Sequence, residues 1–333
     1  MATREFNRVT TVIYDPVPAN VAAMRGALYD IGIRNIDIFD NLKMLQIRLT
    51  NQLYDLVIGE VSSASDPFIA FVRDVRRGAA SRNPFAPIVA TTSILSAPLV
   101  RAAIDAGVDD IMGRPFSYKQ VSQRIFALIE ARKPFVVTSD YVGPDRRSVP
   151  RPGSAPAKFI DAPNTLCAKT RGDAEGLREA EKMIAQRSQE LMRERIKRLG
   201  LRIRSMAEEL GSDAQIAKNV EKAGDLGKFT TAHKRSATAD ELIGFCNEFR
   251  RSVKLAGYEQ PDSMTRTIVE AAESIKRNGF SAGEAESIAE LTRAVEILTD
   301  PDIDPGEALR RVQKAAMIVA QGRKSNVKLA ANG

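Results

Sequence analysis

The sequence predicts an α/β fold over residues 1–133, a doubly wound five-stranded parallel sheet, followed by an all-α C-terminal domain. Short β-branched and apolar runs alternate five times with segments whose apolar residues recur at helical spacing. This alternation is typical of parallel strands covered by helices on both faces. Strand-like runs then disappear after about residue 172, which predicts that the remainder is helical.

Each predicted strand is followed by a predicted helix that has amphipathic spacing or capping residues. For example, Val21, Met24, Leu28 and Ile31 are spaced as one face of a helix that Gly32 ends. The five strands are predicted at 8–15, 35–41, 54–60, 85–93 and 109–116, and the helices at 18–32, 41–52, 67–79, 96–108 and 117–133.

Polar residues gather where these strands end, which is where parallel α/β folds carry their functional side chains. Asp15 and Pro16 end the first strand, Glu60 the third, Thr91 and Thr92 the fourth, and Arg114 with Pro115 the fifth. Glu60 is unusual because it follows the apolar run Leu56–Ile58 and Gly59, a pattern of a strand buried on both faces.

The segments VIYDPVPAN, YDLVIGE, PIVATTS and AGVDDIMGRPFS resemble the receiver domain of bacterial two-component response regulators, over about residues 6–133. The resemblance implies a flavodoxin-like fold, a role in cytoplasmic signal transduction, and protein partners. It also implies a pocket in which two adjacent acids hold Mg²⁺ and an Asp accepts a phosphoryl group, with Thr or Ser and a Lys before Pro nearby.

Three positions depart from that pattern. Pro16 has no side-chain oxygen for a metal, and Glu60 replaces the phosphoacceptor with a longer side chain. Arg114 replaces the compact ammonium of Lys with a planar guanidinium, and the two are not interchangeable. We therefore expect Mg²⁺ binding through Asp15 and Glu60 to be weak or absent.

Three interpretations of Glu60 remain open at this stage. Its permanent charge reaches toward Arg114 and imitates the phosphorylated state, which makes the domain a pseudo-receiver. Alternatively, Glu60 and Arg114 are a residual ion pair, or Asp15, Glu60 and Thr92 still support weak Mg²⁺-dependent phosphorylation in a phosphorelay.

Residues 134–171 carry six prolines, and we predict an extended Pro-rich linker there. The linker contains YVGPDRR, which is weakly similar to a short tail after receivers in some bacterial regulators.

The apolar spacing over residues 172–211 predicts one long amphipathic helix. Its seam at 192–210 has coiled-coil spacing, with Leu199 near its centre. The opposite face is basic: Arg193, Arg195, Lys197, Arg198, Arg202 and Arg204.

The seam predicts either a homodimer or partner helix, or a helix packed on its own domain. A homodimer through the receiver surface is another possibility, and the basic face permits DNA binding. Residues 212–322 predict a helical bundle, with capping patterns at Thr238, Ser281 and Asp304. Residues 323–333 predict a frayed tail.

The net charge, the apolar runs and the cysteines limit the classes of function that we expect. The net charge of +7 permits nucleic-acid contact without requiring it. The chain lacks an apolar run of about 18 residues, so we expect no membrane span, and two distant cysteines fit a reducing cytoplasm. Because no catalytic motif is found, we expect a non-enzymatic signalling or adaptor protein that acts through protein contacts. The alternatives are a DNA-binding response regulator or a phosphorelay member with residual phosphoacceptor activity.

Overall fold

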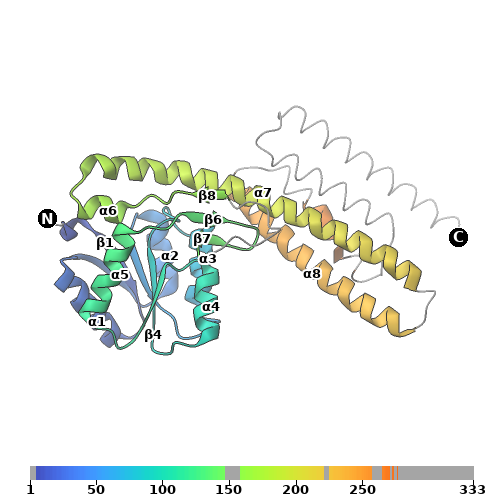
Figure 1. Ribbon diagram of the computed structural model, residues 1–333, viewed down its shortest axis with the longest axis horizontal. Coiled ribbons are helices and arrows are strands. Elements are labelled where there is room, and N and C mark those ends of the chain that lie inside the picture. Colours follow the sequence, from blue (N-terminus) through green and yellow to red (C-terminus); the bar gives the residue numbers. More distant parts are fainter. Residues whose placement is uncertain are drawn as a thin grey trace. The chain divides into compact units, whose positions relative to one another are not determined.

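The computed structural model (Figure 1) describes residues 5–146, 158–220, 225–256, 265–270, 272, 273 and 276. The chain forms two compact units, Met1–Met192 and Arg193–Gly333. The first unit contains the strands and the helices up to the first half of α7, and the second contains the rest of α7 and α8.

The elements follow one another in strict alternation until the fifth helix. Their bounds are η1 (Phe6–Arg8), β1 (Thr10–Tyr14), α1 (Pro18–Ile31), β2 (Asn35–Phe39), α2 (Leu42–Asn51), β3 (Leu56–Glu60), α3 (Pro67–Arg76), β4 (Ile88–Thr92), α4 (Ala97–Ala106), β5 (Asp110–Gly113), α5 (Tyr118–Glu130), β6 (Phe135–Val137), β7 (Val142–Pro144), β8 (Lys158–Ile160), α6 (Thr165–Thr170), α7 (Ala174–Val220) and α8 (Asp225–Leu255).

The five predicted strands form one parallel sheet in the order β2-β1-β3-β4-β5, which confirms the predicted doubly wound fold. Apolar side chains on one face of the sheet pack against α1 and α5, and those on the other face pack against α2, α3 and α4. Because helices cover both faces, all five residues of β4 are buried. The register sets Glu60 opposite Thr91, so the carboxyl ends of β3 and β4 meet at one edge.

The predicted linker was wrong for the part of 134–171 that the structure describes. β6, β7 and β8 form an antiparallel sheet in the order β7-β6-β8, and α6 follows. Phe135, Val137 and Ile160 are buried in a small core. Pro144 lies in β7, an edge strand that pairs only with β6, where a missing amide hydrogen breaks no ladder. Pro134 therefore lies just before β6 and Pro144 in an edge strand.

The helix predicted over 172–211 begins at Ala174 and continues to Val220. α8 begins at Asp225 and passes through Thr238, so the capping pattern there does not start a helix. The patterns at Ser281 and Asp304, most of the predicted bundle and the predicted tail lie outside the described residues. Within the described part of the chain, no helix is long and apolar enough to cross a membrane.

Candidate functional site

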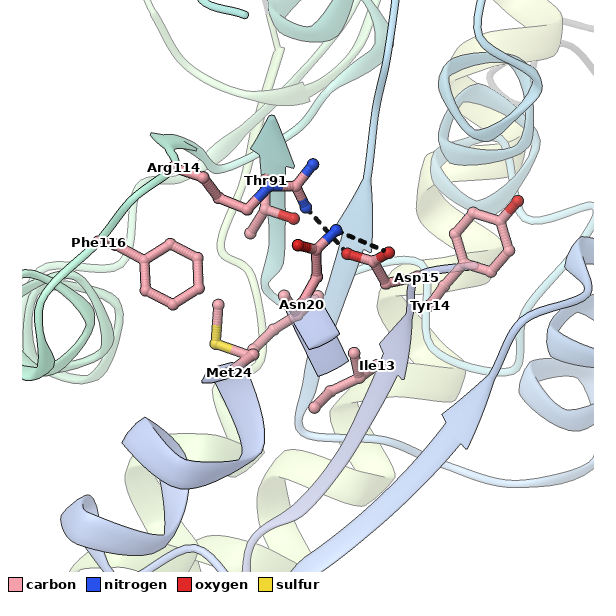
Figure 2. A pocket seen from close by; sticks show the side chains of 9 residues that line it. Ile13, Tyr14, Asp15, Asn20, Met24, Thr91, Arg114 and Phe116 are labelled. Atoms are coloured by element: carbon pink, nitrogen blue, oxygen red, sulfur yellow. Dashed lines mark hydrogen bonds and ion pairs between the residues drawn. The ribbon is translucent and has the colours of Figure 1, made fainter. Parts of the chain in front are cut away.

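One guanidinium joins two carboxylates at the carboxyl edge of the sheet. Figure 2 shows its contact with the first of them, Asp15. Arg114 Nη1 donates to Asp15 Oδ2 over 2.9 Å, and Arg114 Nη2 donates to Glu60 Oε1 over 3.1 Å. Asp15 and Arg114 directly follow β1 and β5, and Glu60 is the last residue of β3, so the three come from segments distant in sequence. Their side chains are 5% exposed for Asp15, 12% for Glu60 and 15% for Arg114, so the group is largely shielded from water.

Asp15 is held in place from its own loop. Its Oδ1 accepts hydrogen bonds from the Val17 amide over 2.8 Å and from Asn20 Nδ2 over 3.2 Å. Pro16, between Asp15 and Val17 in the sequence, contributes no side-chain oxygen. Since Oδ2 is bonded to Arg114, both oxygens of Asp15 have partners in this arrangement.

Opposing effects act on the pKa of the Glu60 carboxyl. Burial raises its pKa, the hydrogen bond and positive charge of Arg114 lower it, and the negative charges of Asp15 and Asp66 raise it, with a net upward shift. The net shift of the Glu60 pKa is upward because burial, the largest effect, disfavours the charged carboxylate, and the nearby Asp15 carboxylate shares the same cation. The guanidinium therefore holds together two groups that would otherwise repel each other.

The predicted site residues do not all meet. Asp15, Glu60 and Arg114 are in contact, whereas the Thr92 hydroxyl donates to the Ile94 carbonyl over 3.3 Å and accepts from the Ile94 amide over 3.2 Å. It is Thr91 that lines the small pocket beside Arg114 (Figure 2). Pro115 follows Arg114 through a cis peptide bond.

Gly59 has a role that the sequence did not reveal. A Cβ at this position would lie 2.0 Å from Cζ of Phe68, a fully buried residue of α3. The Phe68 ring also stacks on Tyr14, with the ring centroids 5.4 Å apart. Gly59 thus leaves the space that lets α3 pack closely on β3 beside Glu60. An isolated glycine inside a strand run was the available signal, because it often marks close approach.

The residues present fit a guanidinium better than Mg²⁺. A family receiver would offer two adjacent acids at this place, and here one of them is Pro16. The remaining carboxylates of Asp15 and Glu60 each already bind Arg114. Among the described residues, no group of three or more His, Cys, Asp or Glu side chains could hold a metal ion. Weak or absent Mg²⁺ binding stays a prediction.

The seam of α7 is buried within the second unit. Ile196, Leu199, Ile203 and Met206 are at most 3% exposed. α8 runs antiparallel beside this part of α7: Arg195 pairs with Glu248, and Arg202 lies over the ring of Phe245 at 5.5 Å. This burial favours the interpretation in which the helix packs on its own domain.

The basic face of α7 is partly neutralised. Arg198 pairs with Glu194 over 2.7 Å and Arg204 pairs with Glu208 over 3.1 Å, both one helical turn apart. Arg195 is buried against Glu248 rather than presented to solvent. The surface available to a nucleic acid is therefore less positive than the sequence pattern indicated.

No family model matches the chain, and neither does any curated protein. Solved structures that it resembles include a two-component response regulator from Clostridium difficile, at 22% identity and a TM-score of 0.33, covering 37% of this chain and 98% of that one. A signal receiver domain of a histidine kinase from Clostridium thermocellum matches at 15% identity and a TM-score of 0.32, covering 37% of this chain and 98% of that one.

A third similar structure is the receiver domain of a sensor histidine kinase from Pseudomonas aeruginosa PAO1, described with a magnesium ion coordinated in its active site cleft. It is 20% identical, with a TM-score of 0.30, and the match covers 36% of this chain and 95% of that one. The assignment of fold rests on the chain's own topology, a parallel sheet in the order β2-β1-β3-β4-β5 with helices on both faces. Unit 1 therefore contains a domain with the receiver fold.

Proposed function

We propose that this chain is a non-enzymatic signalling protein whose receiver domain acts through protein contacts without being phosphorylated. In this proposal, the ion pair between Glu60 and Arg114 takes the place of an aspartyl phosphate and its cationic partner, and the helical region is the output. The proposal combines the resemblance over residues 6–133 with the departures at Pro16, Glu60 and Arg114.

The observation that carries the proposal is the reach of two side chains across the pocket. A phosphorylated Asp would place negative charge beyond the end of β3, where a cation from β5 could meet it. Glu60 is one methylene longer than Asp, Arg114 is longer than Lys, and the two meet at 3.1 Å. Glu60 carries the same single charge as an unphosphorylated Asp but extends it farther from β3, where Arg114 already binds it.

The two alternatives have less support in the described residues. DNA binding would use the basic face of α7, where Arg198 and Arg204 pair with glutamates of the same helix. Residual phosphoacceptor chemistry would use the Thr92 hydroxyl, which is bonded to the backbone of Ile94. These contacts exclude neither DNA binding nor phosphorylation. The Glu60–Arg114 pair favours a receiver domain that stays in one conformation without being phosphorylated.

The test compares partner capture by the full chain, Glu60→Gln and a matched control, Glu130→Gln. Glu130 also pairs with an arginine, Arg171, but it is exposed at the end of α5, where ion pairs contribute little. The proposal predicts that cross-linking and quantitative mass spectrometry find proteins whose capture changes with Glu60→Gln and not with Glu130→Gln. Equal capture by all three would leave Glu60 as a residual ion-pair member.

A further inference from the structure

A buried cluster of charges lies at the opposite edge of the sheet from the candidate site. Arg76 of α3 is fully buried, and its Nη2 donates to Asp109 Oδ2 over 2.6 Å. The other oxygen of Asp109 lies 2.9 Å from Arg132 Nη1, just after α5. Burial lowers the pKa of Arg76 to about 10, so its guanidinium stays charged at neutral pH.

Arg76 also holds the C-terminal end of α4. Its Nε donates to the Gly107 carbonyl over 2.8 Å, and Nη1 donates to the carbonyls of Pro84 and Ala86 over 2.6 and 2.8 Å. Gly107 ends α4 with a φ of 93°, a left-handed conformation that favours glycine. The turn from α4 to β5 is therefore tied to α3 by one buried side chain.

The segment after α5 closes over this cluster. The Phe135 ring of β6 lies 5.1 Å from the Arg76 guanidinium carbon and 5.6 Å from that of Arg132. Arg146, which follows β7, donates to the Val108 carbonyl and, over 2.6 Å, to the Asp109 carbonyl. The hairpin formed by β6 and β7 thus contacts both the cations of the cluster and the backbone of the α4–β5 turn.

The glycines at this contact leave no room for a side chain. A Cβ on Gly107 would lie 2.7 Å from the Val142 carbonyl oxygen, and a Cβ on Gly143 would lie 2.9 Å from Gly107 Cα. Tyr141 Oη donates to the Pro144 carbonyl over 2.8 Å, which fixes the shape of the hairpin. These contacts give a physical role to Tyr141, Gly143 and Arg146, three residues of the YVGPDRR sequence.

The hairpin is supported from its outer side as well. Ile160 of β8 and Leu191 of α7 pack with Phe135, Val137 and Val142 in one small core. Lys158 of β8 pairs with Glu190 of α7 over 2.9 Å. In Figure 1, β6 and β7 lie beside α3, and residues of α3 and β7 are in contact. Residues 134–146 are thus enclosed between the receiver fold and the first half of α7.

We propose that residues 134–146 form a clasp that immobilises the α4–β5 turn, and so holds the receiver domain in one conformation. The structure gives this clasp three anchors on the receiver: the ring of Phe135 against two buried guanidiniums, the guanidinium of Arg146 on two turn carbonyls, and the close approach of Gly143 to Gly107. The proposal concerns the conformational freedom of α4 and does not depend on the role of Glu60.

The test measures amide hydrogen exchange of the full chain by mass spectrometry in the parent and in Arg146→Ala. The clasp predicts that exchange in peptides covering 103–109 and 134–146 becomes about tenfold faster or more, because hydrogen bonds to a charged group are lost. The matched control is Arg124→Ala, which removes an exposed guanidinium paired with Asp110 of β5 over 3.1 Å but leaves the clasp intact. The control is expected to leave exchange in both peptides as in the parent.

Two results would overturn the clasp. One is unchanged exchange at 103–109 in Arg146→Ala. The other is an equal increase in peptides covering α1, which would indicate uniform loss of stability rather than release of the turn. A second variant, Phe135→Leu, removes the ring from the two guanidiniums while keeping an apolar side chain, and it is expected to release the same peptides.

Discussion

Removing Arg114 should destabilise the first unit strongly, because two nearly buried carboxylates would lose their shared cation. The proposed change is Arg114→Gln. Breaking a buried ion pair by removing one partner costs roughly 3–5 kcal/mol. Arg114 is 15% exposed, so we expect the lower end of that range, about 3 kcal/mol of unfolding free energy at pH 7.

The loss should depend on pH. In the variant, burial and Asp15 still raise the pKa of Glu60 while the lowering effect of Arg114 is gone. A folded-state pKa above the unfolded value means that the folded state binds more protons between the two values. Stability therefore falls as pH rises through that window, above the ordinary Glu value of 4.5. The deficit of Arg114→Gln should be smaller near pH 5 than at pH 7.

Urea unfolding followed by tyrosine fluorescence measures this deficit in the first unit, because five of the six tyrosines precede residue 192. The control is the double variant Glu60→Gln with Arg114→Gln, which removes one carboxylate and should recover part of the loss. A deficit below about 1 kcal/mol at pH 7 would mean that the pair is no stronger than a surface ion pair. An equal deficit at both pH values would refute the electrostatic reasoning.

Two further substitutions test the packing. Gly59→Ala places a Cβ 2.0 Å from Phe68 and should lower the unfolding free energy by about 1–3 kcal/mol, measured by the same urea series. A change within 0.5 kcal/mol, the range of neutral surface substitutions, would mean that the ring moves freely. Leu199→Asp places a charge at a fully buried position and should reduce helical circular dichroism. Unchanged helicity with a halved solution mass would instead identify a dimer seam.

The sequence predicted the sheet and its edge because both rest on local signals. Apolar runs such as Leu56–Ile58 have no polar face, which is typical of a strand covered on both sides. Once the strands are parallel, their carboxyl ends coincide, which brings Asp15, Glu60 and Arg114 together from three distant segments. The contact between Glu60 and Arg114 depended on side-chain reach, and two of the three interpretations from the sequence included it.

The segment after α5 could not be predicted because its stability is not local. β6, β7 and β8 are three residues each, and such short strands are stable only against other parts of the fold. Their support comes from Arg76 and from Leu191, which lie far away in sequence. The prolines predicted an extended linker without regular structure. The burial of Phe135 and Ile160 depends instead on tertiary packing. The seam of α7 was ambiguous for a similar reason, since its contacts with α8 join residues about 50 positions apart in the sequence.

The central claim is that the receiver fold of this chain signals without phosphorylation. Its most direct test is the intact mass of the full chain after incubation with Mg²⁺ and phosphoramidate, beside a variant that restores the family's set through Pro16→Asp, Glu60→Asp and Arg114→Lys. We predict no added mass for the native chain and one phosphoryl group on the restored variant. A phosphoryl group on the native chain that disappears in Glu60→Ala would contradict the account.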